Sequence, residues 1–225
     1  MIDEQLTAFQ TFLDELGLGG RSLDAIAQLY HDLVAANKKT NLTRITDEAD
    51  FYFRHVADSL AVVSICPELL GETAPVVADV GCGGGFPILP LAWANPALRI
   101  CGIECRTKKT AFIAEEIQRL GFPFASVETA QVREAARGEH GGQYDMVVLR
   151  AVGESGKFLR EVRGLLKSDA PGRIINYKTP SAVEIERAVT AREAKKFGFD
   201  VIETSPFELP LNMGTRCFVI LEKQM

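Results

Sequence analysis

A glycine-rich turn between Asp79 and Gly85 carries the residues of this sequence whose types and spacing could do chemistry. The turn follows the apolar run at residues 76–80, and we expect it to connect a strand to a helix. Glycines let the backbone turn tightly and approach a ligand closely, and the first turn of a helix presents unpaired N–H groups. The segment therefore predicts a site for a nucleotide-like ligand.

Two acidic residues indicate which ligand this is. The pattern is acidic-x-GxGxG, and the sixth position counted from Gly81 is Phe86, where a dinucleotide-binding GxGxxG would have glycine or alanine. A carboxylate at Asp79 would repel a pyrophosphate and attract the ammonium group of a methionine moiety. Glu104 ends the next expected strand, where its carboxylate could accept hydrogen bonds from both ribose hydroxyls. We therefore expect S-adenosylmethionine as the ligand and methyl transfer as the reaction.

The strand expected at residues 144–150 ends where a methyl acceptor would approach the donor in line. Its end has neither the Asn/Asp-Pro-Pro-aromatic element of enzymes that methylate adenine amines nor a Pro-Cys nucleophile pair. Arg150 could hydrogen-bond an acceptor base, orient the cofactor through neighbouring groups, or be a solvated charge at a strand end. An acceptor with a free lone pair, such as N7 of guanine, needs no general base, so Arg150 could act by positioning.

After about residue 75, short apolar strands alternate with helical segments, which is typical of a parallel sheet covered on both faces. The last two strands have no helix between them, so we expect them to pair in antiparallel fashion. The strands are expected at residues 76–80, 98–104, 144–150, 172–178, 200–205 and 216–221, and helices at 108–120 and 181–197.

Residues 1–70 read as a helical N-terminal extension that packs on a domain of residues 71–225. Apolar residues recur at helical spacing from Gln5 to Ala36 and predict two helices, broken at residues 17–20, with Ser22 as the N-cap of the second. A third helix is expected over residues 48–65, because the residue before Pro67 avoids helical geometry.

The composition is that of an ordinary soluble globular protein, with 47% hydrophobic and 24% charged residues. The first ten residues lack the features of a signal peptide and no stretch is apolar enough to span a bilayer, so we expect a cytoplasmic protein, and a monomer. The five cysteines do not form the paired CxxC spacing of zinc sites, and we expect no metal. Cys101 and Cys105 are interpreted as small apolar filler.

The formal net charge of −5 argues weakly against a nucleic-acid partner. The charges are unevenly distributed, because residues 1–70 hold 5 Lys and Arg against 11 Asp and Glu, whereas residues 71–225 hold 20 against 19. A local basic surface is therefore compatible with the acidic total.

Several motifs together resemble the family of small-subunit ribosomal RNA guanine-N7 methyltransferases, RsmG, formerly called glucose-inhibited division protein B. The most specific is the element Arg54-His55-x-x-Asp58-Ser59 ahead of the glycine turn. The others are Asn41-Leu42-Thr43, the segments 79–90 and 104–112, Arg150-Ala151, Lys178 and Arg216.

The resemblance implies a class I S-adenosylmethionine-dependent methyltransferase fold, with a Rossmann-like, mostly parallel seven-stranded sheet. It also implies methylation of N7 of a guanine in the 530 loop of 16S ribosomal RNA, without a covalent intermediate. The cofactor contacts that follow by position are Asp79, Gly81, Cys82, Gly83, Gly85, Phe86, Glu104, Cys105, Arg106, Val132, Arg133 and Arg150. The RNA contacts are Asn41, Arg54, His55, Lys178 and Arg216, with naked RNA or the small ribosomal subunit as the partner.

The chain departs from the family pattern at Ile88, where relatives often have a glycine, and at Arg133, where they have an acidic residue. Three other functions stay open from the residues alone. The acceptor could be a small molecule or protein, the chain could be a non-catalytic RNA-binding protein with a vestigial pocket, or it could be an NAD-dependent oxidoreductase, which Phe86 and Asp79 disfavour.

Overall fold

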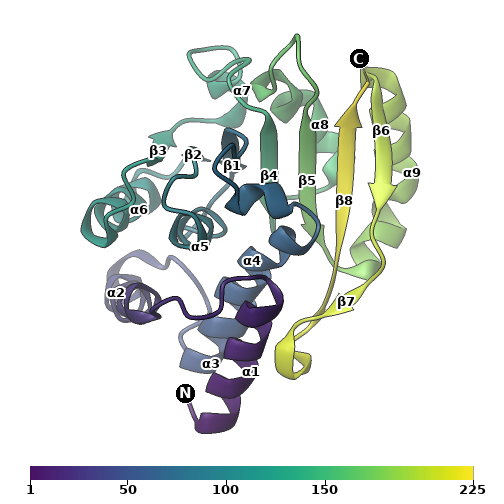
Figure 1. Cartoon of the computed structure of the whole chain (residues 1–225). Coiled ribbons are helices and arrows are strands. Elements are labelled where there is room, and N and C mark those ends of the chain that lie inside the picture. The colour runs from purple at the N-terminus through teal and green to yellow at the C-terminus, as the bar shows by residue number, and fades with distance from the viewer. Residues whose placement is uncertain (225) are drawn as a thin grey trace.

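A mixed sheet forms the centre of the molecule in the computed structural model, which describes residues 1–224 (Figure 1). The strand order is β3-β2-β1-β4-β5-β8-β6, and the first five of these strands are parallel. β8 runs antiparallel to both β5 and β6, and the short β7 pairs with β8 outside this path. The strands are β1 (Val77–Val80), β2 (Ile100–Glu104), β3 (Ala125–Thr129), β4 (Met146–Arg150), β5 (Arg173–Lys178), β6 (Phe199–Glu203), β7 (Phe207–Glu208) and β8 (Thr215–Lys223).

This topology confirms the mostly parallel, Rossmann-like sheet and its antiparallel end. Six of the seven strands on the main path lie where the apolar runs predict them. β3 has no such run because it is an edge strand, and four of its five residues are exposed or half-buried. Its sequence, ASVET, therefore lacks the continuous hydrophobicity of the buried strands.

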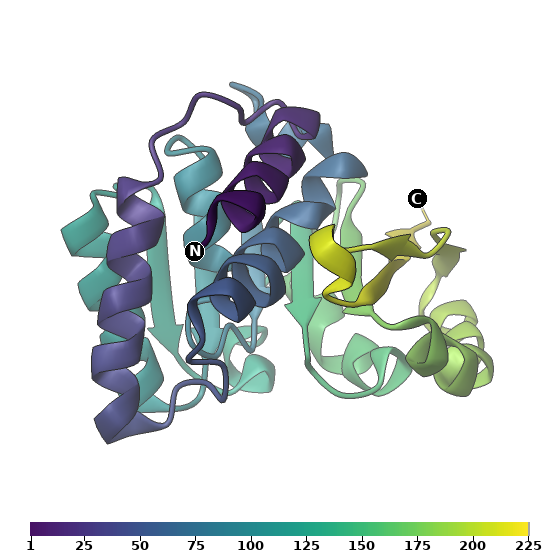
Figure 2. The same ribbon diagram turned by 90° about the horizontal axis from the view of Figure 1, so that it is seen from below.

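Helices cover both faces of the sheet, since strand residues alternate between two cores (Figure 2). Val148 and Ile175 belong to the core on the side of the N-terminal helices, whereas Val147 and Ile174 belong to the core on the opposite side. The first side carries α5 (Ile88–Ala94) and α6 (Thr107–Leu120), and the other carries α7 (Val132–Ala135), α8 (Ser155–Val162), η4 (Arg163–Leu165) and α9 (Pro180–Phe197).

The N-terminal helices share a core with the sheet instead of forming one of their own. Phe9 of α1 and Leu33 of α2 are buried in the same cluster as Ile88 and Val148. The helices are α1 (Asp3–Glu15) and α2 (Asp24–Thr40). Leu23, without a side-chain cap, precedes α2, so Ser22 as the N-cap is wrong by one position, although its Oγ accepts a hydrogen bond from Asp24 N at 3.2 Å.

The prediction of a single α-helix over residues 48–65 is wrong, because the segment changes its helix type several times. The segment is a succession of α3 (Glu48–Asp50), the π-helix η1 (Phe51–Ala57), α4 (Asp58–Leu60) and the 3₁₀-helix η2 (Ala61–Ser64), followed by η3 (Pro67–Leu70). Asp47 starts it by accepting a hydrogen bond from Asp50 N at 3.0 Å. A π-turn changes which side chains share a helix face, and such turns occur often at functional sites. Arg54 and His55 lie in this turn.

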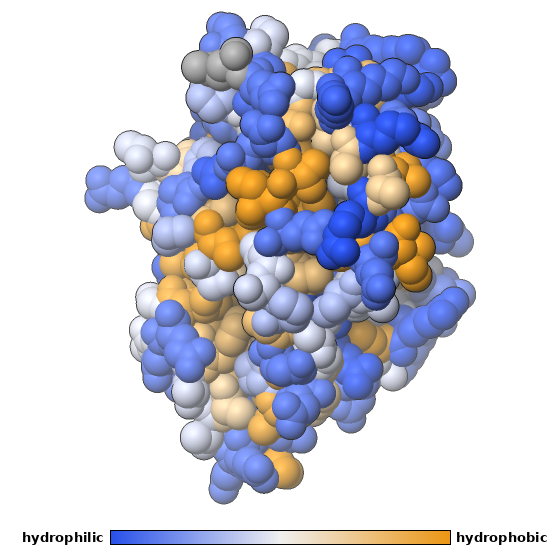
Figure 3. Space-filling model, turned by 90° about the vertical axis from the view of Figure 1, so that its right-hand side faces the viewer, coloured by the Kyte–Doolittle hydropathy of each residue, from blue (hydrophilic) through white to orange (hydrophobic). Residues whose placement is uncertain are grey.

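The side formed by α9 and β6 is mostly hydrophilic, with small apolar areas between the charged residues (Figure 3). Ile185 and Ile202 are the most exposed large apolar side chains of α9 and β6.

No helix within residues 1–224 combines the length and the apolar composition needed to cross a membrane. The 3₁₀-helix η5 (Pro210–Asn212) lies between β7 and β8.

Candidate active site

Three glycines of the turn after β1 have positive φ angles, which favour glycine. The angles are 72° at Gly81, 59° at Gly83 and 98° at Gly85. A Cβ on Gly81 would lie 2.8 Å from Cγ2 of Val152, and a Cβ on Gly85 would overlap the side chain of Leu89. The sequence therefore needs glycine here for conformation and for close packing, and the turn it predicts is confirmed.

Asp79 is fully buried beneath the turn, with one carboxylate oxygen bonded and the other free. Oδ2 accepts a hydrogen bond from Ile88 N at 2.8 Å, which fixes the start of α5. Oδ1 has no hydrogen-bond partner among the described residues. Burial raises the pKa of Asp79 to about 7, against the opposing effects of the Ile88 N–H and Arg150. A buried acceptor without a donor is uncommon, and a ligand that brings an N–H group fits it.

Glu104 lies at the end of β2, directly beside the turn. Its Oε2 accepts a hydrogen bond from Gly83 N at 3.2 Å, and its Oε1 accepts one from Arg106 N at 3.0 Å. The side chain is 7% exposed, so its position is fixed while each oxygen keeps further acceptor capacity. This geometry is suited to a ligand with two neighbouring hydroxyl groups.

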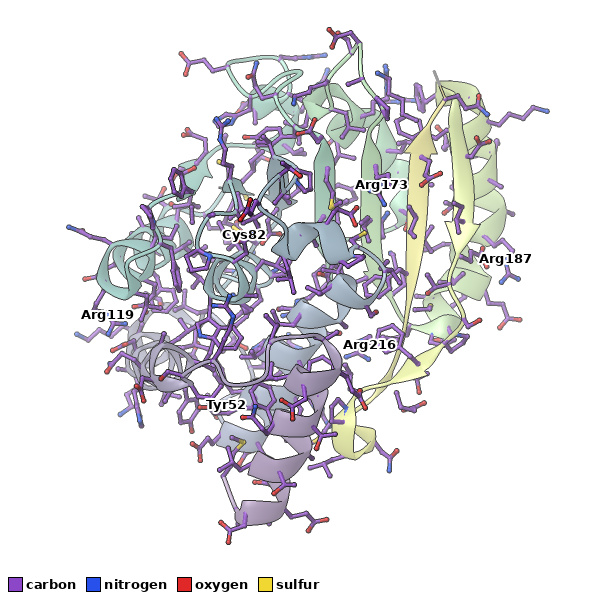
Figure 4. The ribbon with its side chains drawn as sticks, in the orientation of Figure 1. Tyr52, Cys82, Arg119, Arg173, Arg187 and Arg216 are labelled. Carbon is purple, nitrogen blue, oxygen red and sulfur yellow. The ribbon has the colours of Figure 1, made fainter. Side chains whose placement is uncertain are left out.

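The side chain of Cys82, labelled in Figure 4, is buried in the interior. A Cβ on Gly102 of β2 would lie 2.8 Å from its Sγ, so Gly102 is required for this packing, and sequence reasoning missed it. Burial and the nearby Asp79 and Glu104 hold the pKa of the Cys82 thiol well above its ordinary value. Only the backbone of Cys82 remains available to a ligand at the turn.

The other expected cofactor contacts directly follow β2 or begin α7. Cys105 and Arg106 are exposed directly after β2, so Cys105 as apolar filler is wrong, whereas Cys101 is buried as expected. Val132 is half-buried at the start of α7, and Arg133 next to it is exposed.

A cleft of about 680 Å³ opens at the C-terminal ends of β4 and β5, next to the glycine turn. It brings together five of the residues predicted for catalysis or RNA contact: Arg54, His55, Arg150, Lys178 and Arg216. Asn41 is not among its lining residues and lies exposed at the end of α2, with a φ of 49°. The lining also includes Asp58, Ala151, Val152, Glu154, Tyr177 and Glu186.

Arg150 is held in this cleft by three acceptors from the N-terminal segment. Its Nη1 donates to Asp58 Oδ2 at 2.7 Å and to the Arg54 carbonyl oxygen at 2.9 Å, and its Nη2 donates to His55 Nδ1 at 2.9 Å. The side chain is 13% exposed, so Arg150 is not a solvated charge at a strand end. Its guanidinium is oriented before any substrate binds.

His55 connects Arg150 to the glycine turn. Its ring stacks on Phe86 with centroids 4.3 Å apart and an angle of 7° between the planes. Burial, with the nearby Arg150, lowers the pKa of His55 to about 3, so the ring is neutral. Because Nδ1 accepts from Arg150, Nε2 carries the proton and donates to Thr43 Oγ1 at 2.8 Å.

Asp58 joins the two guanidinium groups of the cleft, and its role was not assigned from the sequence. Its Oδ1 accepts a hydrogen bond from Arg216 Nε at 2.9 Å, while Oδ2 binds Arg150 (Figure 4 shows Arg216 beside the helical segment that carries Asp58). The signal was present in the Arg54-His55-x-x-Asp58 spacing, which a helical turn brings close together.

Lys178 is paired inside the protein. Its Nζ donates to the Gly153 carbonyl oxygen at 2.6 Å and lies 2.9 Å from a carboxylate oxygen of Glu186. Arg54 differs, because its side chain is 48% exposed and its Nε pairs with Asp50 on the same helical segment. Within residues 1–224, no three His, Cys, Asp or Glu side chains are placed to hold a metal ion.

A known protein family matches most of this sequence. The family model described as rRNA small subunit methyltransferase G (GidB) matches residues 22–205. Ribosomal RNA small subunit methyltransferase G of Gloeobacter violaceus is 32% identical over 197 residues, which cover 87% of this chain and 76% of that protein.

Solved structures share the fold at lower identity. Cofactor-bound Rv0187 from MTB superimposes with a TM-score of 0.62 and 20% identity, covering 94% of each chain. Magnesium protoporphyrin IX methyltransferase from Synechocystis PCC 6803 with bound SAM superimposes with a TM-score of 0.57 and 16% identity, covering 91% of this chain and all of that one. The class I methyltransferase fold is thereby confirmed.

Proposed function

Because the chain belongs to the family of rRNA small subunit methyltransferase G, we propose that it transfers a methyl group from S-adenosylmethionine to small-subunit ribosomal RNA. The acceptor that we propose is N7 of a guanine in the 530 loop of 16S ribosomal RNA. The transfer is direct and in line, without a covalent intermediate. We also propose that the protein acts as a monomer in the cytoplasm.

The hydrogen bonds and the low pKa of His55 are the observation that supports guanine N7 as the acceptor atom. Both ring nitrogens are engaged, with Arg150 and Thr43, and the pKa of about 3 leaves the imidazole a poor proton acceptor at neutral pH. Asp58 is occupied by Arg150 and Arg216. His55 and Asp58 are therefore used for positioning, which suits a ring nitrogen that attacks with its own lone pair.

In this proposal the cofactor binds at the glycine turn between β1 and α5. The unpartnered Oδ1 of Asp79 accepts a hydrogen bond from the methionine moiety, and Glu104 accepts from the ribose hydroxyls. The backbone at Gly81, Gly83 and Gly85 allows close approach, and residues at 105–106 and 132–133 flank the adenine. When bound, S-adenosylmethionine supplies the methyl group from its sulfonium.

Arg150 positions the base in the cleft. Its guanidinium is fixed by Asp58, His55 and the Arg54 carbonyl, and guanine offers O6 beside N7 as a hydrogen-bond acceptor. Asp58 offsets part of the positive charge of Arg150 and Arg216, which reduces repulsion of the cationic donor.

The proposal is tested by incubating the protein with tritiated S-adenosylmethionine and small-subunit particles or 16S RNA that lack the modification. We expect tritium in the RNA, and mass mapping of nuclease fragments places the methyl group at one guanine of the 530 loop. Borohydride and aniline treatment then cleaves the RNA there, because N7-methylation labilises the base. Cofactor binding without transfer to RNA, or a methyl group on another atom, contradicts the proposal.

A further inference from the structure

A groove of about 410 Å³ on the side of the sheet opposite the N-terminal helices is lined by four arginines. These are Arg133 on α7, Arg137 in the turn after it, Arg160 on α8 and Arg163 on η4. We call this feature the arginine groove. Its remaining lining residues are Ala136, Gly164 and the acidic Glu161.

The guanidinium groups of the arginine groove carry uncompensated charge. Within residues 1–224, none of the four lies within 4.0 Å of a carboxylate oxygen. Several arginines elsewhere on the surface are paired, as Arg119 is with Asp32 and Arg187 with Glu203. Four close positive charges with one acidic neighbour repel one another, and an anionic partner would relieve this repulsion.

The walls of the arginine groove are held together by backbone contacts. Gly142 N donates to the Gly164 carbonyl oxygen at 3.0 Å, and Tyr144 N donates to the Leu165 carbonyl oxygen at 3.1 Å. A Cβ on Gly164 would lie 3.3 Å from Cβ of Ala136, so the two walls approach closely at this point. Arg163 is further ordered by stacking on Phe197, with its Cζ 4.5 Å from the ring centroid.

Apart from Arg133, which adjoins the proposed cofactor site, the arginine groove lies away from the active-site cleft. η4 adjoins the start of β4, whereas the cleft opens at the end of β4, and five strand residues span about 17 Å. Figure 1 shows α7 at the end of the molecule opposite α1, α2 and α3. A partner that fills both places must be larger than a single stem-loop tip.

We propose that the arginine groove binds the sugar-phosphate backbone of the RNA substrate at a segment outside the target loop, an inference that rests on the proposed function. The guanidinium fork matches phosphate oxygens and forms bidentate hydrogen bonds with them. The cleft itself supplies few free charges, because Arg150, Arg216 and Lys178 are paired with Asp58 or Glu186. Cations outside the cleft must therefore supply much of the attraction between an acidic protein and RNA.

The chemistry of the lining favours RNA over a protein partner. Protein interfaces are usually anchored by buried aromatic or large aliphatic side chains, and this lining has only Ala136 and Gly164 as apolar members. Contacts to phosphate need cations in an open, polar groove and no apolar pocket.

The test replaces Arg137, Arg160 and Arg163 with glutamine and leaves Arg133, which adjoins the proposed cofactor site. The control triple is Arg187→Gln, Arg192→Gln and Lys195→Gln on α9, which removes the same charge elsewhere. Binding of 16S RNA to each protein is measured as a function of salt concentration. The slope of log K against log salt concentration is the quantity compared. For the groove triple, which is the variant with glutamine at 137, 160 and 163, we expect this slope to fall in magnitude by about two units, because each lost phosphate contact removes about 0.7 to 0.9 units. We expect the control triple to keep the wild-type slope.

Steady-state kinetics give a second readout, in which the groove triple raises KM for RNA and keeps kcat. The lysine triple carries Arg137→Lys, Arg160→Lys and Arg163→Lys. It keeps the wild-type salt slope, because it keeps the three positive charges. The inference is overturned if the groove triple binds RNA with the wild-type slope, or if the lysine triple is as defective as the glutamine triple. Loss of activity on particles with unchanged RNA binding would also overturn it, since the partner would then be a protein. Absence of methyl transfer by the wild type tests the proposed function separately, because the salt slope does not depend on catalysis.

Discussion

Arg150 at the end of β4 and Asp58 on α4 form an ion pair of 2.7 Å, although 92 residues separate them in the sequence. Both side chains are largely buried, and the pair connects the N-terminal segment to the methyltransferase sheet. The helical extension is thus part of the candidate active-site cleft, since it supplies the groups that orient Arg150.

Replacing Asp58 with asparagine should lower the free energy of unfolding by about 3 kcal/mol, because it leaves Arg150 and Arg216 partly buried without a counter-charge. Activity should fall further than stability explains, since Arg150 loses its fixed orientation. Urea unfolding and methyl transfer at a temperature where the variant is folded measure the two effects. The matched control is Glu203→Gln, which removes an exposed ion pair with Arg187 and should cost less than about 1 kcal/mol. Equal losses in the two variants would contradict a special role for Asp58.

Above pH 7, where the Asp79 carboxyl is ionised, Asp79→Asn should weaken binding of S-adenosylhomocysteine by about 1–3 kcal/mol, because the variant loses the charge that faces the ammonium group. Binding of 5′-methylthioadenosine, which lacks that group, should stay unchanged. Calorimetric titration with both ligands checks this. Asp47→Ala, which removes the side-chain cap of α3, is the control for a general effect of losing a backbone N–H acceptor at a helix start. If Asp79→Asn weakens both ligands alike, our placement of the methionine moiety is wrong.

Glu104→Gln should weaken both ligands, unlike Asp79→Asn, which should weaken only S-adenosylhomocysteine. Both ligands carry the ribose, so both should bind more weakly, by about 1–3 kcal/mol, when the carboxylate between Gly83 N and Arg106 N becomes an amide. The same calorimetric titration applies. Unchanged affinity for 5′-methylthioadenosine would exclude the ribose from this position.

Gly81→Ala should destabilise the protein by about 1–2 kcal/mol, because its φ of 72° is unfavourable for a residue with a Cβ. The added Cβ would also displace Val152, whose Cγ2 it would approach to 2.8 Å. Adding Val152→Ala removes the clash and leaves the strain in the backbone. A double-mutant cycle by thermal unfolding should therefore show partial recovery, and full recovery would mean that the φ angle does not matter.

His55 should make the folded protein less stable as the pH falls from about 6.5 to about 3. Its pKa is lowered to about 3 in the folded state, so only the unfolded chain takes up this proton between those values. The melting temperature of the wild type should therefore fall more steeply with acidification than that of His55→Gln. Asp79 contributes the opposite trend, because burial raises its pKa, but it is present in both proteins and cancels in the comparison. Parallel curves would show that His55 titrates normally.

The order of strands and helices followed from local patterns in the sequence. The strands β1, β2, β4 and β5 are buried on both faces, and such strands can be recognised in a sequence by their continuous hydrophobicity. β3 could not be recognised in this way, since an edge strand needs no continuous apolar run. The π-turn at η1 was also missed, because helical periodicity does not register one extra residue in a turn.

The sequence by itself determined the glycine turn and the two carboxylates beside it, because these residues are close along the chain or lie at successive strand ends. Only the tertiary structure decided that Asp79 keeps one free oxygen while the other fixes Ile88. It also decided that Asp58, Arg150 and Arg216 meet in one cleft. Contacts between residues so far apart arise from helix packing against the sheet, and neither spacing nor periodicity records which side chains that packing brings together.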